Sequence, residues 1–204
     1  MNESVAVRSI EQISGKKQRL FLDNGEVWVL YRGEIHTLHL AEGAELSDGQ
    51  YQKIRTEILG KRAKKRAIHL LERMDRTEEQ LRRKLAESEY PPDLIEDAID
   101  YVKGYHYVDD ARYADCYVRF HGETKSRGKL LTELKSRGID RDLAEQVLAA
   151  AEDSRDEPAM IRKLLEKRRY DPQEASPQEK RRMYGYLMRR GFRCEDVCRA
   201  IEGR

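Results

Sequence analysis

The sequence lacks any hydrophobic run long enough to cross a lipid bilayer, which takes about 18 consecutive apolar residues. Its first four residues, Met1 to Ser4, do not have the basic and apolar regions of a secretory signal. Cysteine is scarce, and three cysteines in a chain without an export signal argue for reduced thiols and against a disulfide framework. We therefore expect a cytoplasmic protein that makes no contact with a membrane.

Motifs of catalysis and of metal binding are also missing. There is no Ser/His/Asp arrangement, glycine-rich phosphate loop or His-Glu-x-x-His motif, and the histidines are scattered along the chain. Cys194 and Cys198 are four residues apart on the predicted last helix, but a zinc site would need two further ligands. We interpret them as residues that flank Val197 and pack at the end of a repeat. The sequence predicts no enzymatic activity and no cofactor.

Apolar residues are few: hydrophobic residues make up only 39% of the chain and charged residues 38%. With so few apolar residues, the hydrophobic core must be assembled from narrow apolar stripes on many helices rather than from one thick apolar mass. The composition therefore predicts a thin, elongated and mostly α-helical molecule.

Strand-like patterning is confined to the first 46 residues, in three short apolar runs. These runs are Val5 and Val7, Leu20–Leu22, and Val27–Leu30. Asn24 and Gly25 separate the last two runs, and both residues tolerate the positive φ of a two-residue type I′ hairpin turn. The segment is predicted to form a small β meander that ends near Tyr31.

The remainder of the chain contains three copies of one apolar pattern, in which four positions are separated by five, five and four residues. In the second and third copies an Arg-Gly pair precedes the second position, and Gly138 and Gly191 are expected to end a helix in the left-handed conformation. Each copy is therefore predicted to be a helix, a tight turn and a second helix. The copies are Leu85, Tyr90, Ile95 and Ile99; Leu134, Ile139, Ala144 and Leu148; and Leu187, Phe192, Val197 and Ile201.

A further helix precedes each pair, over residues 67–74, 111–120 and 160–168, so the predicted repeat is a three-helix bundle. A bundle of about 45 residues buries too little surface to be stable alone, so we expect the three to stack into an elongated, curved array. Helix caps support the boundaries, at Ser47 with Gln50, Thr77 with Gln80, Ser126, Asp140, and Ser176 with Glu179. The predicted domains are a β segment (1–46), a connecting helix (47–60) and repeats at 61–105, 106–153 and 154–204.

The net charge of +2 hides an alternation of charged blocks. Segments 61–84, 111–141 and 161–204 carry about +6, +4 and +6, whereas segments 85–110 and 142–160 carry about −7 and −5. Lys and Arg lie on the first two predicted helices of each repeat, and Asp and Glu on the third. The array is therefore predicted to have one basic and one acidic side.

A single basic cluster is ordinarily a solvated helix face, but these clusters recur at the same phase of the repeat. Stacking would align them into a basic stripe that follows a phosphate backbone or an acidic protein groove. Few aromatic residues accompany them, which argues against sequence-specific reading of single strands. Each cation is expected to lie in solvent and to contribute little alone, so binding would be collective. The candidate residues are Arg82, Arg83, Lys84, Arg112, Lys125, Arg127, Lys129, Lys135, Arg137, Arg181, Arg182, Arg189 and Arg190.

Arg112 belongs to a polar and aromatic cluster that begins at Gly104. The simpler interpretation is a helix junction, in which Asp109 or Asp110 caps the next helix and Tyr113 packs inward. A direct binding role for Arg112 is the alternative.

Three segments carry a family resemblance: Gly104–Ala114 (GYHYVDDARYA), Gly128–Ile139 (GKLLTELKSRGI) and Tyr186–Phe192 (YLMRRGF). They resemble the RecX family of bacterial RecA regulators, over about residues 61–204. Lys16–Gly25 is also similar to the N-terminal extension of some longer members. One departure is the segment Glu89–Pro92, where the family often has a Lys-Gly turn, so a differently shaped loop is expected there.

The resemblance implies a non-enzymatic protein that binds in the helical groove of the RecA filament on single-stranded DNA. It implies suppression of ATP hydrolysis, strand exchange and co-protease activity, and so a role in DNA repair, homologous recombination and the SOS response. A monomer that contacts several filament subunits would gain affinity through multivalency. Its basic stripe would also touch single-stranded DNA.

Two other interpretations stay open. Three-helix units with a tight turn resemble helix-turn-helix modules, which bind DNA directly through a basic recognition helix. The third predicted helices are instead acidic, with Asp93 and Glu96 in one unit and Asp142 and Glu145 in another. The second alternative is a helical scaffold for a different protein partner.

Overall fold

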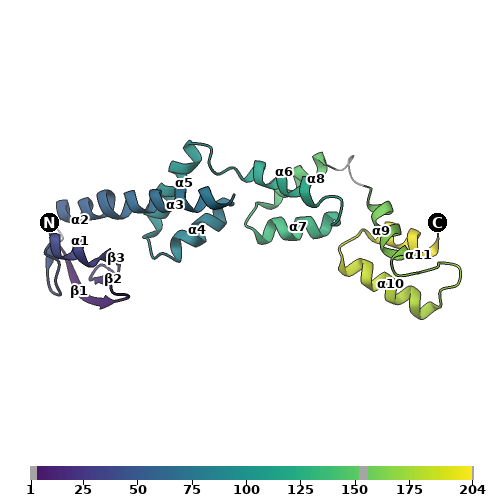
Figure 1. Ribbon diagram of the computed structural model, residues 1–204, viewed down its shortest axis with the longest axis horizontal. Helices are drawn as coiled ribbons and strands as arrows, with labels where there is room; N and C mark the ends of the chain where they lie inside the picture. Colours follow the sequence, from purple (N-terminus) through teal and green to yellow (C-terminus); the bar gives the residue numbers. More distant parts are fainter. Residues whose placement is uncertain (1–3, 152–155, 204) are drawn as a thin grey trace. The chain divides into compact units, whose positions relative to one another are not determined.

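The structure, a computed structural model, describes residues 4–151 and 156–203. It consists of two compact units, residues 1–109 and 110–204. The first unit holds the β-sheet and the first set of three long helices, and the second unit holds two further sets of three within its described residues (Figure 1). The predicted fold, tandem three-helix repeats after a small β segment, is confirmed.

The N-terminal sheet is antiparallel and has the strand order β3-β2-β1-β4. Its first three strands are the predicted meander, and their inward side chains, Trp28 among them, form the core of this part of the chain. Two further elements, α1 (Arg32–Thr37) and β4 (Glu45–Leu46), were not predicted, because they are too short to show a hydrophobic period. The meander consists of β1 (Val5–Gln12), β2 (Lys17–Leu22) and β3 (Val27–Tyr31).

The hairpin between β2 and β3 differs from the predicted type I′ turn. That turn needs positive φ at both central residues, but of Asn24 and Gly25 only Gly25 has one, at +88°. Gly25 N donates to Leu22 O (3.2 Å) and Leu22 N donates to Glu26 O (2.9 Å), so the loop has three residues. This pattern is a type I turn followed by a glycine bulge.

A continuous helical segment joins the sheet to the first repeat. α2 (Asp48–Lys53) begins at the predicted capping box of Ser47 and Gln50. It runs through the π-helical segment η1 (Ile54–Gly60) into α3 (Lys61–Arg73). Arg55 of η1 is ion-paired with both Glu26 and Asp93, and these charge-assisted bonds tie the sheet to the first repeat within the first unit.

Each repeat has three helices around its own apolar core. The equivalent residues Leu85, Leu134 and Leu187 are fully buried, each in the core of its own repeat, as the threefold spacing predicted. The first repeat is α3, α4 (Glu78–Ala86) and α5 (Pro92–Gly104). The second is α6 (Asp110–His121), α7 (Arg127–Ser136) and α8 (Arg141–Ala150), and the third is α9 (Glu157–Glu166), α10 (Pro177–Arg189) and α11 (Cys194–Glu202).

The predicted N-terminal caps are present. Each cap side chain accepts a hydrogen bond from a backbone N–H in the first turn, which satisfies a donor that the helix itself leaves open. Thr77 and Ser126 are buried as well, so their hydroxyl groups are part of the repeat interior. The caps are Thr77 on α4, Ser126 on α7, Asp140 on α8 and Ser176 on α10.

The turn between the second and third helices has the same backbone shape in all three repeats. Gly138 and Gly191 have φ of +89° and +81°, as predicted, and Glu89 at the equivalent position of the first repeat has φ of +59°. The expectation of a differently shaped loop at Glu89 is therefore wrong. A non-glycine residue in this conformation costs about 1 kcal/mol. The Glu89 carboxylate forms a bidentate ion pair with Arg19 of β2, with two N–O distances of 2.6 Å, which holds this turn against the sheet.

Within the second unit, the turn after α10 packs directly on the N-terminus of α7. The Ser126 hydroxyl donates to Arg190 O, and the Glu157 carboxylate accepts from Arg127 N. A Cβ added at Gly128 would lie 2.7 Å from Gly191 O, closer than real Cβ atoms approach. The two glycines thus allow a backbone-to-backbone contact between the second and third repeats.

Candidate partner-binding surface

The three candidate cations of α4 are all held by carboxylates. Arg82 Nε and Nη2 bond to the two oxygens of Glu96 on α5, at 2.7 and 2.9 Å, and Arg82 Nη1 lies 3.1 Å from Glu79. Hydrogen bonds from arginine lower the pKa of both Glu79 and Glu96. The charges are therefore largely compensated inside the first repeat. The remaining pairs are Arg83 with Glu79 (2.8 Å) and Lys84 with Glu87 (2.6 Å).

In the second repeat, Glu133 of α7 lies between two candidate lysines. Lys125 Nζ is 2.7 Å from Glu133 Oε2 and Lys129 Nζ is 3.7 Å from Oε1, while the Tyr117 hydroxyl donates to Glu133 at 2.6 Å. Burial opposes ionisation of Glu133, but the hydrogen bonds from Lys125 and Tyr117 outweigh it and lower its pKa. The bond to Glu133 raises the pKa of Lys125. Lys125 is thus engaged inside the repeat.

Arg127 and Arg137 also differ from the expectation that every candidate cation lies in solvent. Both are half-buried, and Lys125 is too. Arg137 places its guanidinium 4.5 Å from the centre of the Tyr117 ring and donates to the Tyr113 hydroxyl at 2.9 Å. The expectation is therefore wrong for these three residues, and also for the half-buried Arg82 and Lys84 of α4. Lys125 and Arg137 lie against Tyr117 at the edge of the second-repeat core, and the backbone N–H of Arg127 is bonded to Glu157 of the third repeat.

Lys135 and Arg112 are exposed, on α7 and α6. α6 begins at Asp110, as the interpretation of a helix junction predicted, and Tyr113 packs against the core of the second repeat. The structure therefore confirms the junction around Arg112 but leaves its binding role a prediction.

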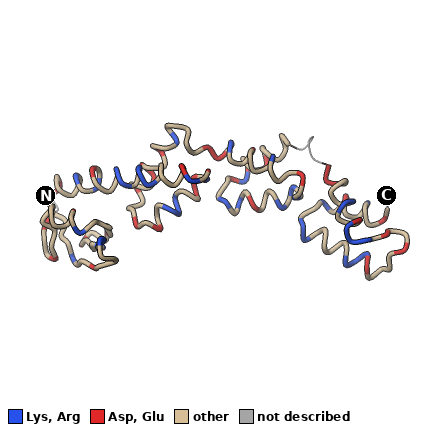
Figure 2. The backbone as a smooth tube through the Cα atoms, in the orientation of Figure 1, with Lys and Arg blue, Asp and Glu red and all other residues tan. Residues whose placement is uncertain are grey.

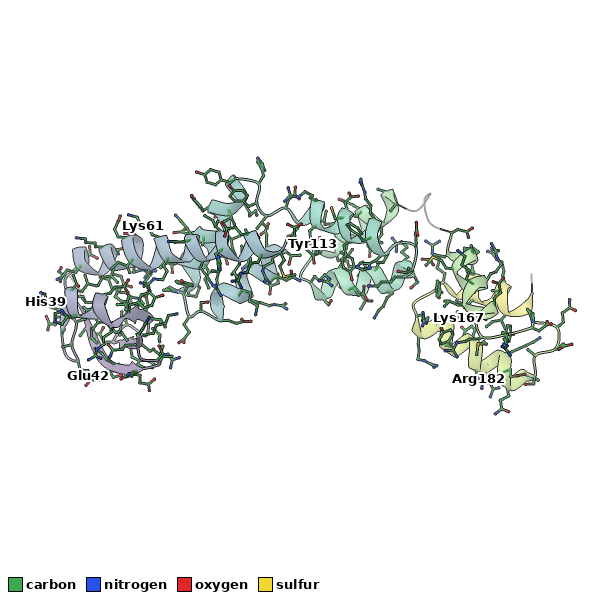
Figure 3. The ribbon with its side chains drawn as sticks, viewed as in Figure 1. His39, Glu42, Lys61, Tyr113, Lys167 and Arg182 are labelled. Carbon is green, nitrogen blue, oxygen red and sulfur yellow. The ribbon has the colours of Figure 1, made fainter. Side chains whose placement is uncertain are left out.

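The cations of the third repeat have a different environment. Arg181, Arg182 and Arg189 are exposed on α10, and Arg190 follows directly after it. None of these four makes an ion pair within residues 4–151 and 156–203. Figure 2 shows Lys and Arg positions along α10, and Figure 3 labels Arg182 there. Of the predicted stripe, this group carries the least compensated positive charge.

Two cations that the sequence did not indicate, Lys167 and Arg168, adjoin this group from the turn after α9. Arg168 and Arg190 both stack on Tyr186, with guanidinium carbons 3.8 and 4.8 Å from the ring centre. Lys167, labelled in Figure 3, is exposed and makes no ion pair among the described residues. No spacing in the sequence indicates this arrangement, because it depends on how the turn after α9 lies against Tyr186 of α10.

The cysteines are free thiols. The two Sγ atoms of Cys194 and Cys198 are 3.9 Å apart, and the Tyr184 hydroxyl is 3.3 Å from Cys194 Sγ. Cys194 is exposed rather than packed, which corrects that part of the interpretation. Among the described residues, no three His, Cys, Asp or Glu side chains are grouped as metal ligands, and no helix is long and apolar enough to span a membrane.

Comparison with known protein families gives matches to all three repeats. Residues 63–101 match the first three-helix domain of RecX, residues 109–148 the second and residues 156–201 the third. The chain is 29% identical over 195 residues to a regulatory protein RecX of Caldanaerobacter subterraneus subsp. tengcongensis, covering 95% of this chain and 96% of that one. It is 33% identical to a regulatory protein RecX of Trichlorobacter lovleyi, over 67% of this chain and 91% of that one.

Solved structures show the same fold. A crystal structure of regulatory protein RecX has a TM-score of 0.62 and 23% identity over 98% of this chain and all of that chain. The crystal structure of RecX from Lactobacillus salivarius has a TM-score of 0.60 and 22% identity, over 71% of this chain and 96% of that one.

Proposed function

Because the chain belongs to the RecX family, we propose that it regulates the RecA recombinase by binding the RecA filament on single-stranded DNA. Its relatives are named regulatory proteins, which is consistent with binding rather than catalysis. Binding would suppress ATP hydrolysis, strand exchange and co-protease activity in DNA repair and the SOS response. We propose that it does so as a monomer in the cytoplasm.

The observation that carries the proposal is the uncompensated charge of α10. Arg181, Arg182 and Arg189 have no carboxylate partner among the described residues, so an acidic protein surface or a phosphate backbone would meet them without first breaking an ion pair. Each exposed charge contributes little alone, so the affinity would come from several contacts together. We assign the partner-facing role to this helix in preference to α4.

The test compares two triple substitutions to glutamine. Arg181→Gln, Arg182→Gln and Arg189→Gln together should weaken co-sedimentation with RecA filaments by about tenfold or more. If the contacts include single-stranded DNA, the slope of log affinity against log salt should fall by up to about 2, at roughly 0.7 for each phosphate contact. The matched control is the triple variant of α4, Arg82→Gln, Arg83→Gln and Lys84→Gln, which should bind within about twofold of wild type.

Naked single-stranded and duplex DNA form the second arm of this experiment. Binding to naked DNA as tight as binding to the filament would support the alternative of a DNA-binding protein acting on its own. The acidic character of α5, with Glu96 held by Arg82, disfavours that alternative, because a recognition helix should be basic. Equal filament affinities in the two triple variants would contradict the role of α10.

A further inference from the structure

A cleft lies between the N-terminal sheet and the first repeat, inside the first unit. Its volume is about 640 Å³, within the range of roughly 300 to 1,000 Å³ that is usual for ligand sites. One wall is formed by β2 and β3, the second by the outer face of α3, and the floor by the turn that contains Glu89 and Tyr90. The proposed binding of RecA by α10 does not involve this cleft.

Positive charge dominates the lining. Lys17 comes from β2, and Lys65 and Arg66 come from α3; all three are exposed, and none makes an ion pair among the described residues. Of the two carboxylates of the lining, Glu89 is bonded to Arg19, and Glu72 lies 3.4 Å from His69, which offsets its charge only when the imidazole is protonated. The three cations without an ion pair outnumber this one carboxylate. The free charge in the cleft is therefore cationic, and an anionic ligand fits it.

Aromatic surface accompanies the cations. Tyr31 is 41% exposed at the end of β3, with Lys17 Nζ 5.6 Å and the Arg62 guanidinium 4.7 Å from its ring centre. Tyr90 on the floor is half-buried, and burial raises the pKa of its phenol although the charges of Arg62 and Arg66 oppose the shift. Aromatic rings beside Lys and Arg suit a ligand that has both flat rings and phosphates, because bases stack on such rings.

The backbone around the cleft argues against two other anionic ligands. Arg62 Nη1 donates to Val29 O at 3.0 Å, which occupies a carbonyl on the edge strand β3 that an added peptide strand would need. The lining contains no glycine, and the helix N-terminus that it includes, at Tyr31, belongs to the six-residue α1 and already donates its N–H to Glu34 at 2.7 Å. The lining therefore lacks the glycine-rich loop whose backbone N–H groups cradle the phosphates of a free nucleoside triphosphate. The phosphates of a nucleic-acid strand are instead usually contacted by long cationic side chains such as those in this cleft.

We propose that this cleft binds a short segment of single-stranded nucleic acid, with Lys17, Lys65 and Arg66 on its phosphates and Tyr31 against a base. The N-terminal sheet then has a function of its own, because it supplies one wall of the site. This site lies in the first unit, whereas the α10 surface belongs to the second unit. The cleft combines cations with tyrosine rings, whereas the α10 surface is a group of exposed arginines.

The test uses the full-length chain and the trinucleotide d(TpTpT), which is long enough to fill one cleft. In amide NMR spectra, titration should shift residues 29–31, 65–72 and 88–90 and leave α10 unchanged. The double variant Lys65→Gln/Arg66→Gln should raise the Kd at least about tenfold. It should also make the Kd less dependent on salt concentration, because two of the three cations that face the phosphates are lost.

The matched control is Arg8→Gln/Lys53→Gln, which removes the same charge from exposed positions of the first unit outside the cleft. This variant should bind within about twofold of wild type. Shifts at other residues, or no shift, would overturn the proposal, as would equal binding of hepta-glutamate. Tighter binding of thymidine triphosphate than of the trinucleotide would assign the cleft to a free nucleotide instead. No RecA is present, so this result and the filament result can each fail alone.

Discussion

α4 and α10 occupy the same place in their repeats, as the second of three helices, yet their positive charges are in opposite states. On α4, Arg82 is bonded to two carboxylates at 3.1 Å or less. On α10, Arg181 and Arg182 have no ion-pair partner among the described residues. The number of Lys and Arg residues in a helix therefore does not determine how much positive charge is available to a partner.

The difference comes from where the carboxylates lie. α4 has Glu79 in its own first turn, and α5 presents Glu96 opposite Arg82. The carboxylate in the first turn of α10 is Glu179, and it is bonded to Ser176 N and Oγ in the capping box. Across from α10, Glu195 pairs with Arg199 on its own helix. A basic cluster is thus a good binding candidate only where nearby acidic groups have other partners.

The largest effect on this comparison should come from Gly191→Ala, which disturbs the turn that anchors α10. An alanine at φ of +81° costs about 1–2 kcal/mol, and its Cβ would lie 3.0 Å from Lys129 N and 3.0 Å from Ser126 Oγ. Crowding adds about 1–3 kcal/mol, so we expect about 3 kcal/mol of destabilisation in the second unit. Helical circular dichroism should be lost at lower urea concentration, while the fluorescence of Trp28, the single tryptophan, should report an unchanged first unit.

Gly25→Ala is the matched control, because Gly25 also has positive φ but a Cβ there meets nothing within 4 Å. It should cost only about 1–2 kcal/mol, and the loss should show in the Trp28 transition, since both residues belong to the β2–β3 hairpin. A larger loss for Gly25→Ala than for Gly191→Ala would contradict the backbone contact between the second and third repeats.

The helical repeat could be predicted because its signals are local. Apolar spacing placed Leu85, Leu134 and Leu187 in three cores, and side chains such as Thr77 and Ser126 marked helix starts, which need only residues two or three positions away. The resemblance to RecX rested on the same segments. Family matches to all three repeats confirm it.

The charge state of the candidate surface could not be predicted, because it depends on contacts between helices. Arg82 meets Glu96 fourteen residues away, and Arg190 meets Arg168 across Tyr186. Such pairs depend on the rotation of each helix about its own axis in the bundle. The spacing of apolar residues does not define that rotation accurately enough to predict which side chains meet. Glu89 is a similar case, since its carboxylate is paired with Arg19, seventy residues earlier in the chain.

The next largest effect should come from lowering the pH, which should destabilise α4 more than α10. Arginine lowers the pKa of Glu79 and Glu96 in the folded chain. Their contribution to stability is therefore complete above the ordinary value near 4.5 and is lost as the pH falls through the lowered values. Hydrogen exchange, corrected for its intrinsic rate, should show residues 78–104 losing more protection between pH 6 and pH 3 than residues 183–190. The capping box of α10 is also acid-sensitive, because the hydrogen bonds from Ser176 lower the pKa of Glu179. Equal losses would therefore mean that the α4 pairs add no more to local stability than this single cap.

A smaller effect is expected from the single bidentate pair of α4. Arg82→Gln should cost about 1 kcal/mol at most, because both partners are partly exposed, with side-chain exposures of 36% for Arg82 and 51% for Glu96. A double-mutant cycle with Glu96→Gln isolates the interaction, and its coupling energy should be about 0.5–1 kcal/mol in urea unfolding. A coupling of zero would show that the α4 charges are as uncompensated as those of α10.

The smallest effect should come from Arg182→Gln, which changes one exposed charge on α10. Arg182 has no ion pair among the described residues, so its removal should alter the free energy of unfolding by less than about 0.5 kcal/mol. Filament affinity should fall only a few-fold, since one exposed charge contributes about 1 kcal/mol or less. If Arg182 contacts a phosphate, the salt slope should fall by about 0.7.

The measurement is a salt titration of filament binding for Arg182→Gln beside Arg82→Gln. An unchanged slope for Arg182→Gln and a reduced one for Arg82→Gln would reverse the roles assigned to the two helices, because the paired charge would then be the one that meets the partner.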